Sequence, residues 1–524
     1  MRHSILRRKN LIPRIAAVPI MISVVITVTG CTRVEVTDRP ISFETTTAIE
    51  FFNAGFSYIQ NNYINETDLG KLVPIGLNGL RQIEPALAVV RSETGDRISL
   101  LIDGRVVYEM KIAIQPKEWA TAIVGLIDRG RAISNALNNA SSERIYAVIF
   151  ETLAHQLDAF SRYSTAKAAR EERAKRDGFG GIGANVEAHF DGALIGRLKS
   201  GQPADLAGLR SGDRIVAIND LIVTGLPLRQ IIELLRGPIR TKVQLTIQRE
   251  PQGKMLRFTA TRAPILEQTV FLVPHQNFAH IRLTNFNQDT LREMRHAIEQ
   301  AQRELGSSIR GLIIDLRGNP GGLLDQAVKV TDLFLETGAI LRTRGRHPLS
   351  HQYFDADSKV IASKLPMAVL VDGASASAAE IIASALQDHS RAIVVGASSF
   401  GKGTVQKILR LPNDGELVLT WAKMHAPSGY ALNRYGVLPT ICTSRIQDTT
   451  VAIAKLEAGT GRSIRQNFIT RRQSQTNNFK RLQELCPWRP HEGKDLDLEV
   501  ATGVLKKPEL YDRVLTFAEP STGS

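Results

Sequence analysis

The sequence predicts a multidomain protein of mixed α/β and α+β class, because the spacing of its apolar residues changes along the chain. The chain has 524 residues, more than a single hydrophobic core usually accommodates. From about residue 276, apolar strands alternate with amphipathic helices, which is typical of an α/β core with a mostly parallel sheet. Residues 184–262 instead resemble short strands with one helix. We therefore expect a signal peptide at 1–30, a mainly helical region with an inserted hairpin at 31–175, a small β-rich barrel with helices at 176–262, the α/β core at 263–445 and a C-terminal extension at 446–524.

The first thirty residues have the features of a bacterial export signal. A basic start, MRHSILRRKN, precedes the apolar run IAAVPIMISVVITV, which Pro19 interrupts and which is short for a membrane-spanning helix. The run ends in VTGC, so small residues precede Cys31, as in a lipoprotein signal. We expect export to the periplasmic side of the cell envelope, with lipid on Cys31 as the membrane anchor. A plain secretory signal is the alternative, and Thr32 leaves inner and outer membrane open.

Composition and charge favour an ordinary globular protein. Hydrophobic residues make up 43% and charged residues 23% of the chain, and the formal net charge is +14. The basic residues form no long block interleaved with aromatic residues, so we do not expect nucleic acid as a partner. In an oxidising compartment Cys442 and Cys486 could form one disulfide. Two buried, unpaired cysteines are the alternative.

The region before residue 176 shows helical periodicity at 42–90 and again at about 118–173. Between these stretches, ISLLIDGRVVYEM has two apolar runs around Asp103 and Gly104. An Asp-Gly pair between apolar runs is a strong signal for a β-hairpin.

Two glycine-rich stretches have the spacing of nucleotide-binding loops but not the required context. GFGGIG, at 178–183, follows a charged helix and precedes a strand-like segment, whereas a dinucleotide loop needs the reverse. GASSFGKG, at 396–403, has Gly403 where a phosphate-binding loop needs Ser or Thr, and the following residues alternate as in a hairpin. We therefore expect no nucleotide, other cofactor or metal.

A serine and a lysine are the best candidates for chemistry. VDGASASAAEIIASAL, at 371–386, predicts a strand, a tight turn and a helix, which would raise Ser375 or Ser377 over the edge of the sheet. A well-capped helix with no chemistry is the alternative. His389 lies about 18 Å away along the same helix and cannot be the base, and nothing local marks an acid to orient His425. A neutral Lys402, expected on one face of a strand with Thr404 and Gln406, can accept the proton if burial lowers its pKa.

Donors for an oxyanion are expected in DLRGNPGG, at 315–322. Gly321 and Gly322 offer bare amides where the strand GLIID ends, and the amide of Ala378 follows the serine. NPGG is also a plain turn.

Taken together, these segments resemble the carboxyl-terminal processing proteases, tail-specific serine proteases with a Ser–Lys dyad. The resemblance covers roughly residues 155–445 and rests on these segments: LDAFSRY, GFGGIGANV, GQPADLAGLRSGDRIVAIND, DLRGNPGG, GASASAAE, LQDHSRAIVVG and SFGKGTVQ. It implies that Ser377 rather than Ser375 is the nucleophile, that Lys402 is the general base and that Gln406 orients the lysine. It also implies a PDZ domain at 176–262, which binds a peptide carboxylate at these residues: Gly180, Gly181, Ile182 and Gly183.

The resemblance implies a serine endopeptidase that recognises the C-terminal segments of exported proteins and cleaves them through an acyl-enzyme. Its expected partners are protein or peptide substrates with accessible C-termini, and an adaptor or activator protein is compatible with the sequence. A non-catalytic PDZ scaffold at the envelope is the alternative function. The chain departs from the family pattern in four places: LDAFSRY lacks the usual Pro-His, residue 379 is Ala, residues 81–150 look inserted, and the tail after 445 is long.

Overall fold

The computed structural model describes residues 44–199, 201–251, 253–357, 360–361, 365–459, 484–487 and 495–518. The predicted signal peptide and Cys31 lie outside the described residues. In this part of the chain, no helix is both long enough and apolar enough to cross a membrane.

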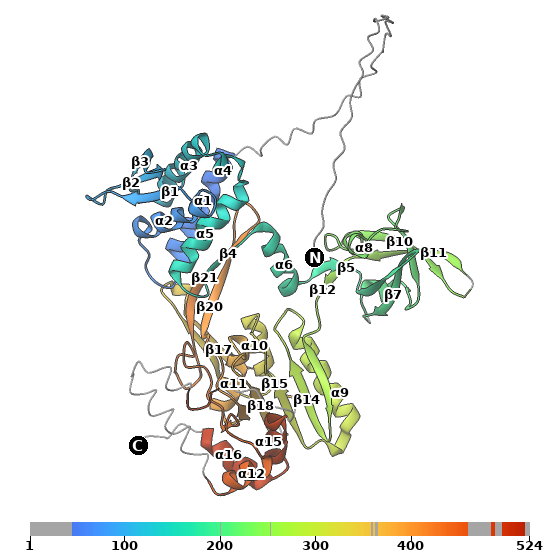
Figure 1. The fold of residues 1–524 in the computed structure, drawn as a ribbon. Coiled ribbons are helices and arrows are strands. Elements are labelled where there is room, and N and C mark those ends of the chain that lie inside the picture. The colour runs from blue at the N-terminus through green and yellow to red at the C-terminus, as the bar shows by residue number, and fades with distance from the viewer. Residues whose placement is uncertain are drawn as a thin grey trace, which may run out of the picture. The chain divides into compact units, whose positions relative to one another are not determined.

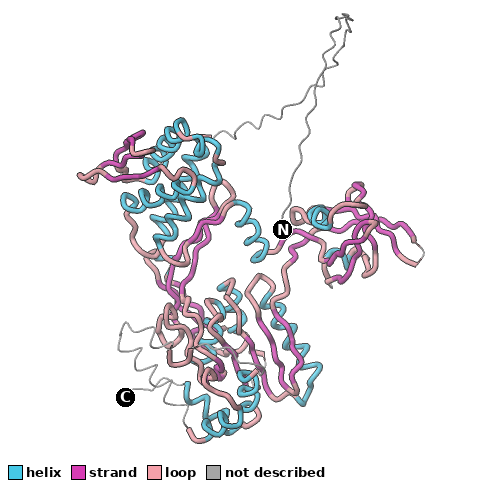
Figure 2. The backbone as a smooth tube through the Cα atoms, in the orientation of Figure 1, coloured by secondary structure: helices cyan, strands magenta, loops and turns pink. Residues whose placement is uncertain are grey.

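The N-terminal part is mainly helical and carries one three-stranded antiparallel sheet (Figure 2). Its helices are α1 (Thr45–Asn62), α2 (Leu69–Leu77), α3 (Pro116–Ile133), α4 (Asn135–Asn139), α5 (Ser142–Leu157) and α6 (Ala166–Asp177). Its strands are β1 (Leu87–Arg91), β2 (Arg97–Ile102) and β3 (Arg105–Lys111). The hairpin predicted at Asp103 and Gly104 is confirmed, and both residues have positive φ, at 51° and 73°. An aromatic cluster forms the core, in which Phe51 stacks on Tyr146 with ring centroids 3.9 Å apart.

The helical stretch predicted over 118–173 is wrong as a continuous unit. Ser141 and Thr165 each accept a hydrogen bond from an amide in the first turn of a new helix, so the chain restarts at α5 and α6. Between these helices, β4 (Arg162–Ser164) is extended because it pairs with a strand from much later in the chain.

Residues 179–265 form a small β-rich domain. Its two ends pair, since β5 (Phe179–Gly181) is antiparallel to β12 (Ala263–Ile265). The main sheet has the order β11-β10-β8-β7-β6, so β6 is an edge strand, and α8 (Leu228–Leu235) buries Ile231 and Leu235 in the core. The strands are β6 (Ala184–His189), β7 (Gly192–Leu198), β8 (Arg214–Ile218), β9 (Leu221–Ile222), β10 (Lys242–Arg249) and β11 (Lys254–Thr261), and a short helix α7 (Pro203–Leu206) follows β7.

The α/β core contains a six-stranded sheet of order β13-β14-β15-β18-β19-β22, parallel except for the β13–β14 pair, as predicted. Its strands are β13 (Val270–His275), β14 (Phe278–Leu283), β15 (Gly311–Asp315), β18 (Met367–Val371), β19 (Ile393–Gly396) and β22 (Ile441–Cys442). One apolar cluster packs the sheet against α9 (Thr290–Leu305), α10 (Leu324–Asp332) and α11 (Ala378–Asp388). Another packs it against α12 (Thr449–Glu457), α15 (Leu496–Leu505) and α16 (Pro508–Leu515). Because both faces are covered, β15, β18 and β19 are buried throughout.

A second sheet has the order β17-β16-β21-β20 and includes β4 from the N-terminal part, paired with β21 (Figure 1). The strands are β16 (Gly338–Arg344), β17 (Gln352–Ala356), β20 (Thr404–Arg410) and β21 (Glu416–His425). β20 and β21 are the predicted hairpin. Arg173 and Arg176 of α6 also bind Glu416 of β21, at 2.8 and 3.1 Å, so two elements of the N-terminal part hold this hairpin.

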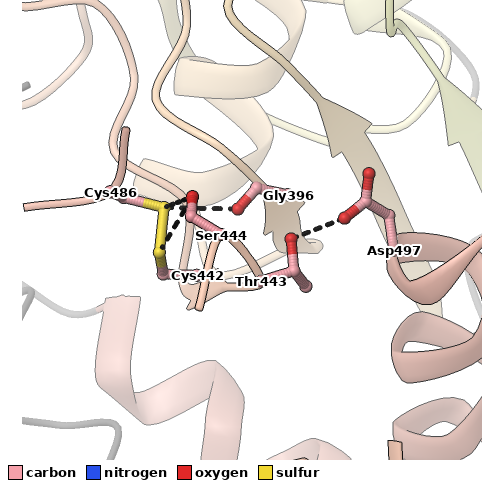
Figure 3. Close-up of a disulfide and its surroundings, with 6 residues drawn as sticks. All are labelled: Gly396, Cys442, Thr443, Ser444, Cys486 and Asp497. Atoms are coloured by element: carbon pink, nitrogen blue, oxygen red, sulfur yellow. Dashed lines mark hydrogen bonds between the residues drawn. A yellow bond between two sulfur atoms is a disulfide. The ribbon is translucent and has the colours of Figure 1, made fainter. Parts of the chain in front are cut away.

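A disulfide joins Cys442, on β22, to Cys486 in the C-terminal extension (Figure 3). The carbonyl of Cys486 accepts a hydrogen bond of 2.9 Å from the amide of Ser398, in the loop after β19. Beside it, Thr443 donates a hydrogen bond of 2.5 Å to Asp497 of α15. The extension is therefore bound covalently and by hydrogen bonds next to the loop that carries Lys402.

Candidate active site

Ser377 lies in a tight turn between β18 and α11, with φ 56° and ψ −112°. This left-handed conformation is unfavourable for a residue with a side chain, by about 1–3 kcal/mol, and persists only where surrounding contacts enforce it. Asp372 supplies such contacts, since its carboxylate accepts hydrogen bonds from the amides of Gly318, Ala374 and Ser375, each of 3.0 Å. The turn thus presents a half-buried Ser377 at the carboxyl end of a parallel strand.

Ser375, the other serine of this turn, is fully buried. Its hydroxyl donates a hydrogen bond of 2.9 Å to the carbonyl of Leu316 and accepts one of 2.9 Å from the amide of Asp372. Its hydroxyl is therefore part of the packing between the serine turn and the end of β15.

Glu380, in the first turn of α11, connects the serine turn to the lysine loop. Its side chain is fully buried. One carboxylate oxygen, Oε2, accepts hydrogen bonds from the amide of Ser377 (2.7 Å) and the amide of Lys402 (3.1 Å). The other oxygen accepts from the amide of Gly401 (2.7 Å) and the hydroxyl of Ser399 (2.6 Å). The amides of Ser377 and Lys402 therefore lie within two hydrogen-bond lengths of each other.

Burial raises the pKa of Glu380, and the hydrogen bonds from Ser399 and from the Ser377 and Gly401 amides oppose this shift. Only one feature of the sequence indicates a structural role for Glu380. The spacing S-A-A-E is that of an ordinary capping box, in which a Glu side chain binds the amide of the residue that begins the helix.

Lys402 is half-buried in the loop between β19 and β20. Burial lowers the pKa of Lys402, the positive charge of Arg162 lowers it further, and Glu380 opposes these effects. Among the described residues, the lysine amine has no hydrogen bond to the Ser377 hydroxyl. It lies instead over the ring of Phe160, with Nζ 5.5 Å from the ring centroid.

The expectation that Lys402 shares a strand face with Thr404 and Gln406 is wrong. β20 begins only at Thr404, because Gly401 and Gly403 both have positive φ and keep the preceding loop irregular. Gln406 donates a hydrogen bond of 2.8 Å to the Thr404 hydroxyl and, among the described residues, makes no hydrogen bond to the lysine amine.

The turn that contains Gly321 and Gly322 lies against the serine turn. A Cβ added to Gly321 would come within 2.8 Å of the Ser377 Cβ, so the two backbones are in close contact. The amide of Gly321 already donates to the side-chain oxygen of the buried Asn319, at 2.8 Å, which corrects its expected role as a free oxyanion donor. The amides of Gly322 and Ala378 have no acceptor within the described ranges.

Arg317 connects this glycine turn to the C-terminal extension. Its guanidinium donates to Asp315 at 2.7 Å and to Asp495, at the start of α15, at 2.6 Å. Burial alone would raise the pKa of Asp315, but hydrogen bonds from Arg317 and His280 hold that pKa well below its ordinary range. Burial alone would lower the pKa of Arg317, but its hydrogen bonds to Asp315 and Asp495 raise that pKa. Sequence reasoning missed this network because Asp495 and His280 are far from Arg317 in the chain.

The expected peptide-binding residues lie at the start of the β-rich domain. Gly180 and Gly181 belong to β5, and Gly183, with φ 75°, leads into the edge strand β6. The side chain of Ile182 is buried in the domain core. This segment could offer a peptide only its backbone groups.

Comparisons with known proteins agree with this architecture. The sequence model of Peptidase family S41 matches residues 277–443, and a PDZ domain model matches residues 194–249. The carboxy-terminal-processing protease of Bartonella bacilliformis is 36% identical over 325 residues, which are 61% of this chain and 71% of that protein. The carboxyl-terminal-processing protease of Synechocystis is 32% identical over 59% of this chain and 73% of its own length.

Carboxy-terminal processing protease CtpA of Bacillus subtilis is 32% identical over 54% of this chain and 60% of its own length. Among solved structures, a photosystem II D1 C-terminal processing protease is 23% identical, with a TM-score of 0.35, and the match covers 72% of this chain and 93% of that one. The chain belongs to the carboxy-terminal-processing proteases of peptidase family S41, and it is a serine peptidase with a PDZ domain.

Proposed function

We propose that the protein cleaves peptide bonds with a Ser377–Lys402 dyad, through an acyl-enzyme, in proteins whose C-terminal segments its PDZ domain binds. The observation that carries this proposal is the buried Glu380 carboxylate, which binds the amides of both residues through one oxygen. A lowered lysine pKa supports the proposal further, because only a neutral amine can accept a proton.

The reaction needs the lysine side chain to move from Phe160 toward the serine. The neutral amine of Lys402 then takes the proton of Ser377 Oγ as this oxygen attacks the peptide carbonyl. The protonated amine returns that proton to the leaving nitrogen as the C–N bond breaks, which leaves an ester on Ser377. A water molecule hydrolyses the ester, with Lys402 again as the base.

The oxyanion of the tetrahedral intermediate would be bound by the amides of Gly322 and Ala378. Both amides lack an acceptor among the described residues, and the glycine turn touches the serine turn. After its hydrogen bond to the Thr404 hydroxyl breaks, Gln406 would hold the lysine amine where it can accept the Ser377 proton.

Substrate capture would occur by strand addition to β6, the edge strand of the PDZ sheet. The peptide carboxylate would bind backbone amides in the segment from Gly180 to Gly183. Helix α8 lies beside this edge and would line the pocket for the last side chain.

The protein would act outside the cytoplasm, anchored to a membrane by lipid on Cys31. This proposal rests on the VTGC sequence alone. Replacing Cys31 by Ala should abolish labelling by a radioactive fatty acid, and unchanged labelling would contradict the anchor.

The dyad is tested with the purified Lys402→Arg and Ser377→Ala variants. Both should lose peptidase activity almost completely, because guanidinium stays protonated and Ala has no nucleophile. The double variant should be little worse than either single one, since the two residues act as a unit. Substantial cleavage by Lys402→Arg would exclude the lysine as the base.

A further inference from the structure

The loop after α5 is fixed to the sheet that contains the β20–β21 hairpin. The carboxylate of Asp158 accepts hydrogen bonds from the amides of Phe160 (2.7 Å) and Ser161 (2.9 Å). It also accepts a hydrogen bond of 2.9 Å from the hydroxyl of Thr420 on β21. The Thr420 amide in turn donates to the Ser161 hydroxyl at 3.1 Å. Residues on both sides of the Phe160 side chain are thus held by the strand that pairs with β20.

This anchoring directs the Phe160 ring to the lysine amine. Nζ of Lys402 lies 5.5 Å from the ring centroid, and both side chains are half-buried. An aromatic ring can attract a cation up to about 6 Å, so at this distance the attraction is weak. The stronger effect of an apolar ring beside an amine is to exclude water, which disfavours the charged form.

Charged groups from several elements lie around the lysine loop. They are Asp158 in the loop after α5, Arg162 of β4, Glu380 of α11, Lys423 of β21 and Arg434, whose amide binds the Gly401 carbonyl. Of these, Arg162 lowers the pKa of Lys402 and Glu380 raises it, but burial has the largest effect.

We propose that Phe160 is a positioning residue for the catalytic reaction: its ring shields the resting Lys402 amine from water, so that the amine is neutral when it moves to the serine. The N-terminal part of the chain thereby contributes one wall of the lysine site. This inference rests on the proposed role of Lys402 as general base.

The test compares full-length Phe160→Ala, Phe160→Leu and wild type in peptide cleavage from pH 6 to pH 10. In parallel, the pKa of Lys402 is measured by competitive labelling with acetic anhydride, read by mass spectrometry, which does not depend on activity. Phe160→Ala admits water, so the pKa of Lys402 should rise toward its ordinary value, and the increase of kcat with pH should move to higher pH. At pH 7 kcat should fall about tenfold, which is less than the roughly 100-fold or more lost when a general base is removed altogether.

Phe160→Leu keeps an apolar cover without a ring, so it should stay within about twofold of wild type with an unchanged pH profile. Phe271→Ala, which truncates a 38% exposed Phe on the edge strand β13, is the matched control and should change neither quantity. An unchanged pH profile and lysine pKa in Phe160→Ala would overturn the inference, and so would a lowered lysine pKa in both Phe160 variants. An active Lys402→Arg would overturn the dyad instead, while the labelling would still report on Phe160.

Discussion

Glu380→Gln is the substitution that most directly tests how the site is assembled. The carboxylate accepts four hydrogen bonds, two on each oxygen, whereas a Gln amide has one accepting oxygen and an NH₂ group that can only donate. If the Gln oxygen faces the amides of Ser377 and Lys402, the NH₂ group faces the Gly401 amide, and two donors cannot form a hydrogen bond. In the other orientation, the NH₂ group faces the amides of both Ser377 and Lys402. The better orientation leaves one buried amide without an acceptor, so we expect a loss of about 1–3 kcal/mol in the free energy of unfolding.

The effect on catalysis should exceed the effect on stability. If the serine turn and the lysine loop separate by even about 1 Å, kcat should fall roughly 100-fold. The assays are peptide cleavage, the rate at which a fluorophosphonate labels Ser377, and thermal unfolding.

Asp213→Asn is the matched control, because Asp213 is a buried carboxylate of the PDZ domain that accepts from Arg210 and Arg249. It should lose comparable stability and keep its labelling rate. A Glu380→Gln enzyme with the stability loss of Asp213→Asn and wild-type labelling would refute the bridging role.

Three further predictions follow from groups around the site. Because the pKa of Lys402 is lowered, kcat of the wild type should rise with pH and level off below the ordinary lysine value of about 10.4; a rise centred at that value would contradict a depressed pKa. Cys486→Ser should lower the free energy of unfolding, measured in urea under oxidising conditions, by about 2–4 kcal/mol, and should also lower kcat because the Cys486 carbonyl binds the Ser398 amide. An unchanged kcat would show that the lysine loop does not depend on the extension. Asp315→Asn should destabilise the protein at pH 7, because the folded-state pKa of Asp315 is depressed. The loss in free energy of unfolding should shrink as the pH falls below about 3.9, and a loss independent of pH would contradict the ionised pairing with Arg317.

The centre of the core sheet was predictable because β18 and β19 are uninterrupted apolar runs. β18, MAVLV, is buried on both faces, and a short apolar run of this kind is typical of a strand covered on both sides. The position of Ser377 at the end of this strand follows from the same pattern. The serine turn was therefore visible in the sequence, although its strained backbone was not.

The rest of the site depends on contacts between distant segments. Phe160 and Lys402 are separated by more than 200 residues, and nothing in LDAFSRY marks a ring that faces an amine. Gly321 looked like a free donor because the orientation of the Asn319 side chain, which takes its amide, is set by packing. The sequence placed Lys402 on a strand because the positive φ values of Gly401 and Gly403 cannot be read from a sequence.

The pairing of β4 with β21 has a consequence for when the enzyme becomes active. If the chain is exported from its N-terminus, Arg162 to Ser164 arrive long before Glu416 to Val418, the residues that pair with them. Cys486 and Asp495, which fasten the extension to the lysine loop and to Arg317, arrive later still. A partly exported chain thus lacks pieces of its own catalytic centre. We expect proteolysis to begin only when nearly the whole chain is available to fold.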